Sequence, residues 1–207
     1  MVYELSNIVA KNLINRLREQ QIDSLHFRHI VKELARFLAY EALSSQKPKT
    51  FSIETWQGKM SFDFLDENNI VFISILRAGL PMIEALSDLF PKASFGFLAM
   101  RRDEQTHKSK TYYDRIPLCK DKIAIIIDPM VASGGSLSDA IDLIKTKGPK
   151  EIFSLNIIGC PHGISIIEKR HPDIKLYIAQ IDEKLDSNMF ILPGLGDAGD
   201  RAYNTPE

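Results

Sequence analysis

The spacing of hydrophobic positions changes along the chain, and each spacing predicts a different element. Between residues 5 and 17, apolar residues recur at helical intervals, which predicts an amphipathic helix. A second predicted helix has Asp23 or Ser24 as its N-cap and carries apolar residues from Phe27 to Leu38 on one face. The chain is therefore expected to begin with two helices.

Beyond residue 50 the pattern becomes that of strands. Apolar and polar residues alternate over residues 50–65, with Gln57-Gly58 as the expected turn of a β-hairpin. Residues 103–120 are polar and predict an excursion from the core. Short apolar runs predict buried strands at 70–75, 94–100, 123–127, 152–158 and 174–178, with helices after Pro81, from the loop after residue 128 to Lys147, and near 164–169.

Strands that alternate with helices predict a parallel α/β sheet, with ligands at the carboxyl ends of the strands. The chain has 207 residues, of which 44% are hydrophobic and 26% charged, which suits one domain over residues 1–207. The expected architecture is thus a parallel sheet with N-terminal helices, a β-arm and a separate C-terminal segment.

Composition excludes several classes of protein. A formal charge of −1 gives no reason to expect nucleic-acid binding through phosphate attraction. Cys119 and Cys160 lie far apart, so neither a zinc site nor a disulfide framework is expected. No apolar run is long enough to span a bilayer, and no signal-peptide pattern opens the sequence, so we expect a cytoplasmic protein.

The richest pattern in the sequence is the run 123–136. A buried strand ends at Asp128, a loop of small residues follows, and an amphipathic helix begins directly after it. Helix N-termini bind anions through unpaired backbone N–H groups, and Gly134 and Gly135 let the backbone approach a ligand closely. We therefore expect a phosphate on residues 132–136, with Asp128 accepting hydrogen bonds from sugar hydroxyls.

This run resembles the phosphoribosyl diphosphate (PRPP) binding motif of the type I phosphoribosyltransferases. Asp128-Pro129, in place of two adjacent acidic residues, is the form typical of the uracil phosphoribosyltransferase family. Other segments resemble that family in the same order: Ile75–Leu80 its diphosphate loop, Met100–Thr106 the start of its flexible arm, and Pro193–Asp200 its uracil-binding segment. Arg101 and His162 depart from the family pattern, and we assign neither a role in the site.

The resemblance implies transfer of ribose 5-phosphate from PRPP to uracil, with release of diphosphate. A guanidinium can bind diphosphate through paired hydrogen bonds, and the resemblance implies this role for Arg77 and Arg102. The implied PRPP-binding residues are Arg77, Arg102, Asp128, Pro129, Met130, Val131, Ala132, Ser133, Gly134, Gly135, Ser136 and Asp197. Of these, Asp128, Arg102 and Asp197 are expected to act in catalysis.

The C-terminal segment implies how the base is chosen. Backbone N–H groups of Gly196 and Ala198 are expected to donate to a uracil carbonyl, and the carbonyl of Ile191 to accept from N3–H. Cytosine presents an amino donor where uracil has a carbonyl, so such a site rejects it. Asp197 is expected to contact PRPP or orient the base, and Asp200 to brace the segment.

Pro129 removes a possible metal ligand, so Mg²⁺ is expected to be held mainly by PRPP, with no protein ligand named. The resemblance also implies a homodimer or larger homo-oligomer, with the apolar hairpin as a candidate interface, and activation by GTP in some members. Two alternatives use the same scaffold. An RNA-binding regulator would carry a basic face, and a transferase for a purine would normally carry the acidic pair and lack the Pro193–Asp200 segment.

Overall fold

The computed structural model describes residues 1–102 and 109–205, and for residues 101, 102, 109 and 110 the backbone alone. Its main sheet has the strand order β1-β10-β9-β7-β4-β5-β6, with β8 beside β9, and every pairing is parallel except that of β5 with β6. The strands are β1 (Val2–Glu4), β4 (Ile70–Leu76), β5 (Ser94–Arg102), β6 (Ser109–Arg115), β7 (Ile123–Ile127), β8 (Met130–Val131), β9 (Glu151–Gly159) and β10 (Lys175–Ile181).

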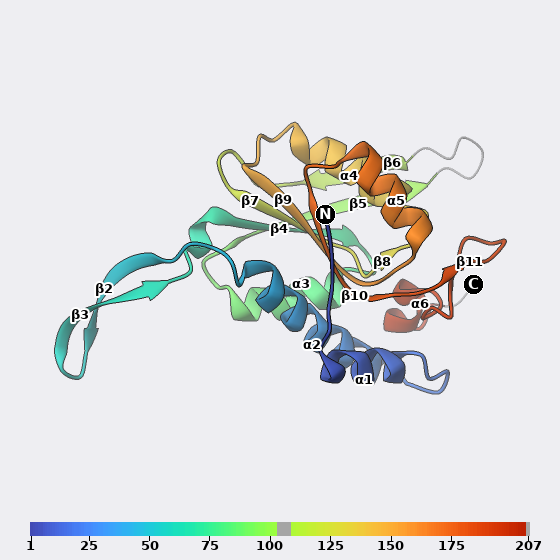
Figure 1. Cartoon of the computed structure of the whole chain (residues 1–207), viewed down its shortest axis with the longest axis horizontal. Coiled ribbons are helices and arrows are strands. Elements are labelled where there is room, and N and C mark those ends of the chain that lie inside the picture. Colours follow the sequence, from blue (N-terminus) through green and yellow to red (C-terminus); the bar gives the residue numbers. More distant parts are fainter. Residues whose placement is uncertain (103–108, 206–207) are drawn as a thin grey trace.

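Helices cover both faces of this sheet (Figure 1). Side chains alternate along β7, so that Ile125 and Ile127 join the core under one helical layer while Ala124 and Ile126 join the core under the other. The predicted α/β class is confirmed. One layer holds α1 (Ile8–Leu17), α2 (Ser24–Leu43) and α3 (Leu80–Leu89), and the other holds α4 (Gly135–Lys145) and α5 (Pro161–Arg170).

The N-terminal helices follow the predicted pattern, with one addition. Asp23 is the N-cap of α2, where its Oδ1 accepts from the N–H of His26 at 2.9 Å. The first helix begins at Ile8 rather than at residue 5, because Val2–Glu4 pairs with β10 as an edge strand. Three residues are too few to show a strand pattern in the sequence.

The excursion predicted for residues 103–120 is corrected in part. Ser109–Arg115 forms β6, which pairs antiparallel with β5 at the edge of the main sheet. Its described side chains from residue 111 onward are exposed, and an edge strand with little burial lacks the apolar run that marks a central strand. Residues 103–108 lie outside the described part of the chain.

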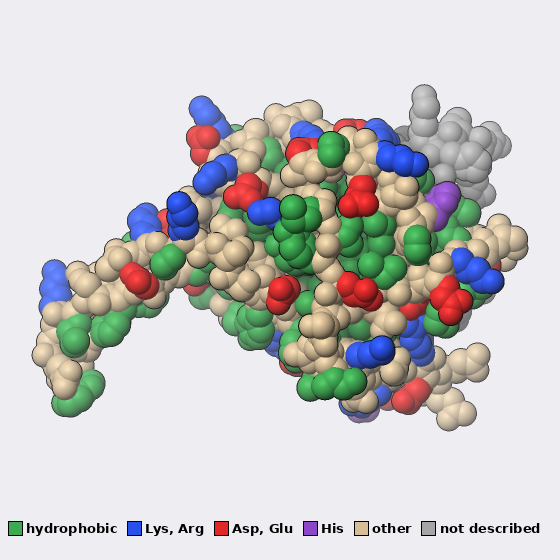
Figure 2. Space-filling view, viewed as in Figure 1, with side chains coloured by type: hydrophobic (Ala, Val, Ile, Leu, Met, Phe, Trp, Pro, Cys, Tyr) green, Lys and Arg blue, Asp and Glu red, His purple; other side chains and the backbone are tan. Residues whose placement is uncertain are grey.

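The hairpin β2 (Lys49–Thr55) and β3 (Gly58–Phe64) projects from the body of the molecule (Figure 1). Thr55 pairs with Gly58, so the turn residues are Trp56 and Gln57, one position earlier than predicted. Figure 2 shows hydrophobic side chains along this arm, where Phe51, Ile53, Trp56, Met60, Phe62 and Phe64 are all exposed.

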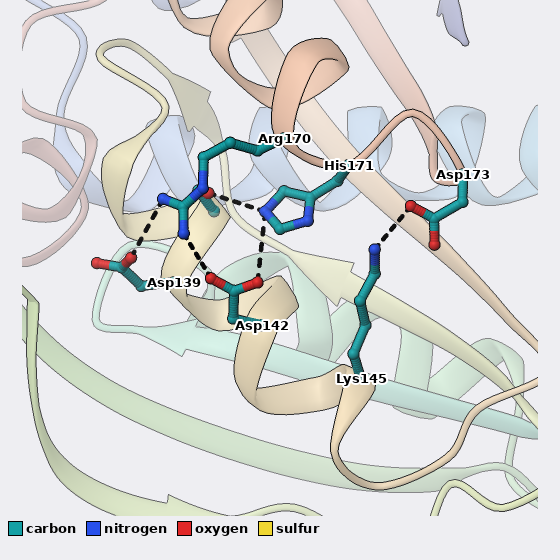
Figure 3. Close-up of polar contacts among 7 residues, drawn as sticks. Asp139, Asp142, Lys145, Arg170, His171 and Asp173 are labelled. Carbon is teal, nitrogen blue, oxygen red and sulfur yellow. Dashed lines mark hydrogen bonds and ion pairs between the residues drawn. The ribbon is translucent and has the colours of Figure 1, made fainter.

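Polar side chains join α4 to the end of α5 (Figure 3). The buried Oγ of Ser138 lies 2.8 Å from Nε2 of His171, and burial lowers the pKa of that imidazole. The contact between Ser138 and His171 joins the helix that begins at the predicted phosphate loop to the residue that ends α5. The ion pairs are Arg170–Asp142 at 2.6 Å, Arg170–Asp139 at 3.7 Å and Lys145–Asp173 at 2.6 Å.

No helix within the described residues is long and apolar enough to cross a membrane.

Candidate active site

Three loops meet at the carboxyl edge of the sheet. The loop after β4 packs on the end of β7, since a methyl group built on Gly79 would lie 2.7 Å from the carbonyl oxygen of Ile127. The start of α6 (Ala198–Tyr203) packs on that same loop, because a methyl group on Gly199 would lie 3.9 Å from Cβ of Ala78. Segments predicted to bind diphosphate, sugar and base are therefore adjacent.

Asp128 stands directly after β7 and is held through its backbone and its side chain. Its carbonyl accepts from Nδ2 of Asn156 at 2.6 Å, and its Oδ1 accepts from the N–H of Met130 at 3.4 Å. The residue keeps partial access to solvent, yet protein atoms surround the carboxyl closely. Loss of hydration raises the pKa of Asp128 to about 7.

The loop after Asp128 has the geometry of an anion cradle. Gly134 takes the left-handed conformation with φ at 78°, and α4 begins at the next residue. The N–H of Gly135 donates to Oγ of Ser133 at 3.5 Å. Residues 132–136 thus lead into the N-terminus of α4, where the first backbone N–H groups have no partner within the helix.

The first turn of α5 supports this loop from behind, which the sequence did not predict. A methyl group on Gly163 would overlap the carbonyl oxygen of Ala132, and one on Gly134 would lie 2.8 Å from the carbonyl oxygen of Gly163. Sγ of Cys160 also donates to Ala132 O at 3.2 Å. The loop and the helix touch through backbone atoms, so Gly163 is required for their approach.

Pro129, Met130 and Val131 form the floor of the loop. The carbonyl of Pro129 accepts from the N–H groups of Ile157 and Ile158, at 2.9 and 3.0 Å. Met130 and Val131 form β8 beside β9. These residues tie the loop to the sheet.

Arg77 connects the diphosphate loop to the C-terminal segment. Its Nη2 lies 3.0 Å from Oδ1 of Asp200, which also accepts from Oγ1 of Thr205 at 2.9 Å. The Arg77 side chain is 55% exposed, so this ion pair contributes little to stability. Asp200 thus braces the segment, as expected.

Ile191 presents its carbonyl away from its own strand pair. In the two-stranded sheet of β11 (Lys184–Leu185) and β12 (Ile191–Leu192), the carbonyls of Phe190 and Leu192 accept from Asp186 and Glu183. Successive carbonyls of a strand point in opposite directions, so that of Ile191 points the other way. It faces Gly194, where any Cβ would collide with it.

The donors predicted for the base come next in the segment. Gly196 has a φ of 70°, and Asp197 is the N-cap of α6, with Oδ1 accepting from the N–H of Asp200 at 2.9 Å. Ala198 is the first residue of that helix, where backbone N–H groups have no partner within the helix. The prediction for Arg102 concerns a side chain outside the described residues.

A mostly parallel sheet with helices on both faces, a carboxylate directly after a central strand and a loop that leads into a helix N-terminus is the arrangement expected of a phosphoribosyltransferase fold. A solved structure from Bacillus anthracis, a hypoxanthine-guanine phosphoribosyltransferase, has this fold, with a TM-score of 0.51, 18% identity and coverage of 81% of this chain and 83% of that one.

Closer relatives narrow the class. The family model "Uracil phosphoribosyltransferase" matches residues 4–205. Curated proteins named uracil phosphoribosyltransferase are 43% identical in Malacoplasma penetrans, over 99% of this chain and 100% of that protein, and 39% identical in Aquifex aeolicus, over 98% of each. A solved Aquifex aeolicus structure matches with a TM-score of 0.95, 39% identity and coverage of 98% of each chain. The chain belongs to the uracil phosphoribosyltransferase family.

Proposed function

We propose that this chain transfers ribose 5-phosphate from PRPP to a ring nitrogen of uracil, giving UMP and diphosphate in cytoplasmic pyrimidine salvage. The observation that carries the proposal is the Arg77–Asp200 ion pair of 3.0 Å. It joins the loop suited to diphosphate to the segment suited to the base, next to the strand that ends at Asp128. Leaving group, sugar and acceptor would thus meet at one edge of the sheet.

PRPP would lie across the two loops at the ends of β4 and β7. The 5-phosphate would bind residues 132–136, the ribose hydroxyls would donate to Asp128, and the diphosphate would bind Arg77 and Arg102. The bond to diphosphate breaks ahead of the bond to the base, so positive charge grows on the sugar ring. Asp128 would stabilise that charge, and the arginines the charge of the leaving group.

Uracil would bind the C-terminal segment through backbone atoms. The Ile191 carbonyl would accept from N3–H, while Gly196 and Ala198 would donate to a carbonyl of the base. Asp197 commits Oδ1 to capping α6, so Oδ2 is the atom that we assign to PRPP or to orientation of the base. One acceptor and two donors in these places match uracil. They do not match cytosine, which presents an amino donor where uracil has a carbonyl.

Magnesium fits this site as part of the substrate. Among the described residues, no three His, Cys, Asp or Glu side chains gather to hold a metal. Asp128 offers a carboxylate beside the loop, and Mg²⁺ readily keeps water and phosphate oxygens as its ligands. Bound through PRPP, the ion would neutralise part of the diphosphate charge.

A base-specificity assay tests the proposal. Purified protein with PRPP and Mg²⁺ is offered uracil, cytosine, hypoxanthine or adenine, with and without GTP, and nucleotide formation is followed. We expect UMP from uracil and no product from the other bases. An increase on adding GTP would identify an activator. Product from a purine, or none from any base under both conditions, would overturn the proposal.

We further propose that the hairpin arm joins two copies of the chain. In the β2–β3 pairing, Phe51 faces Phe62 and Ile53 faces Met60, and Phe64 lies on the same face of the ribbon. The opposite face carries polar pairs such as Thr50 with Asp63. The apolar face also carries Lys49 opposite Phe64 at the base of the arm and Thr55 next to the turn. An exposed ribbon with one mainly apolar face suits burial against a second subunit.

Substitution on the two faces tests this assembly. Phe62→Glu places a charge on the apolar face and should convert a dimer or larger oligomer into monomers, measured by light scattering across a dilution series. Ser61→Glu adds the same charge to the polar face and should leave the mass unchanged. Equal masses for both variants and the parent chain would contradict this interface.

A further inference from the structure

The ion pair between Arg18 and Asp182 joins two segments that lie far apart in the sequence. Arg18, the C-cap of α1, donates from Nη1 to Oδ2 of Asp182 at 2.8 Å and from Nη2 to Oδ1 at 2.7 Å. The Asp182 side chain is 2% exposed, and that of Arg18 is 20% exposed. A two-point pair of this kind fixes both position and orientation, which a single contact does not.

The same pair holds both backbone groups of one residue. The N–H of Gly194 donates to Oδ2 of Asp182 at 2.9 Å, and the carbonyl of Gly194 accepts from Nη1 of Arg18 at 2.8 Å. The backbone N–H of Asp182 donates to the carbonyl of Gly159 at 2.8 Å, which anchors the carboxylate to β9. Gly194 is therefore fixed relative to the main sheet.

Gly194 belongs to the segment that is proposed to bind the base. It lies between Ile191, whose carbonyl faces it, and the donors at Gly196 and Ala198. The next carbonyl, that of Leu195, accepts from Nη1 of Arg201 at 2.8 Å. Because these base contacts are backbone atoms, their spacing depends on what holds the segment and not on their own side chains.

We propose that Arg18 and Asp182 are positioning residues that set the spacing between the acceptor and the donors that recognise the base. This inference rests on the proposed function. Neither side chain is assigned a contact with either substrate, so their effect is transmitted through Gly194. The loop proposed to bind the 5-phosphate has other supports, namely β9 and the first turn of α5, so its geometry should survive the loss of the pair.

Arg18→Gln tests the proposal, with Arg170→Gln as its matched control. Both substitutions remove a guanidinium that pairs with aspartate, but Arg170 pairs with Asp139 and Asp142 of α4, which lie outside the base segment (Figure 3). Initial rates give the KM for uracil and the KM for PRPP of each variant. A displacement of about 1 Å in a binding group can cost up to about 100-fold.

For Arg18→Gln we expect the KM for uracil to rise at least about tenfold, with the KM for PRPP within about twofold of the parent value. Arg170→Gln should move neither KM by more than about twofold. Equal rises of both KM values in Arg18→Gln, or a fall in kcat with neither KM changed, would assign the pair a structural role only. Parent protein that forms no UMP would instead overturn the proposed function.

Arg18→Gln leaves the buried Asp182 without its partner and so also lowers the free energy of unfolding. A milder variant, Arg18→Lys, is therefore tested beside it. Arg18→Lys keeps the charge beside Asp182 but replaces the two-point geometry by one ammonium. If Arg18→Gln shows no cooperative thermal transition, the ratio of the two KM values in Arg18→Lys decides. A selective rise for uracil supports the proposal, and an unchanged ratio overturns it.

Discussion

The Asp128→Asn variant is expected to lose at least about 100-fold in kcat/KM for PRPP while becoming more resistant to unfolding. Activity falls because the amide cannot stabilise the charge on the sugar ring as the carboxylate does. Stability rises because the neutral amide carries no desolvation penalty in a site that raises the pKa of the carboxyl to about 7. Burial of the Asp128 carboxyl thus lowers the stability of the folded chain.

The size of the stability gain depends on pH. The pKa of Asp128 is about 7 in the folded protein, against an ordinary value of 3.8. Below about pH 4 the carboxyl is protonated in both states, and no penalty exists. As the pH rises toward 7 the unfolded state loses its proton first, so the penalty grows, to roughly 2–4 kcal/mol above pH 7.

Denaturant unfolding of both proteins at pH 5 and pH 8 measures this difference. The gain for Asp128→Asn should be larger at pH 8. Asp173→Asn is the matched control, because its pairing with Lys145 lowers the pKa of that carboxyl. That variant should lose a little stability and keep its activity. Full activity in a folded Asp128→Asn protein would contradict the role proposed for Asp128 in binding the sugar.

A second large effect is expected from Gly163→Ala, which inserts one methyl group behind the phosphate loop. Its Cβ would overlap the carbonyl oxygen of Ala132. Because that oxygen belongs to the backbone and cannot turn away as a side chain can, the loop must move. We expect the KM for PRPP to rise about 100-fold and the free energy of unfolding to fall by about 1–3 kcal/mol. Steady-state kinetics and denaturant unfolding measure the two changes.

His162→Ala provides the control at the neighbouring position, since His162 is exposed and its truncation leaves the packing of Gly163 intact. That variant should keep the KM for PRPP of the parent protein. An unchanged KM in Gly163→Ala would show that the loop tolerates displacement and that the first turn of α5 does not position the phosphate.

Two of the main-sheet strands that the sequence predicted correctly, β4 and β7, are buried on both faces and read as apolar runs. The elements it missed lack that signal. β1 and β8 are too short to show periodicity, and β6 is an exposed edge strand. The hairpin was predicted, but its turn was misplaced by one residue because Gly58, with φ at 102°, pairs with Thr55 instead of turning.

The same distinction applies to the site. Asp128 and the loop after it were predictable because strand, carboxylate, glycines and helix follow one another in the sequence. The support from Gly163 and the Arg18–Asp182 pair was not, since their partners lie about 30 and about 160 positions away. Asp182 did carry one signal, a carboxylate at the end of an apolar strand, as at Asp128.

The pairing of β1 with β10 determines when the main sheet can be completed during synthesis. Val2 lies opposite Leu176, so the first strand waits until nearly the whole chain has left the ribosome. Until then β10 is absent from beside β9, which leaves that strand edge open to pairing with other chains. Nascent chains stalled before residue 175 therefore leave the edge of β9 open, and completion of β10, with β1 beside it, covers that edge.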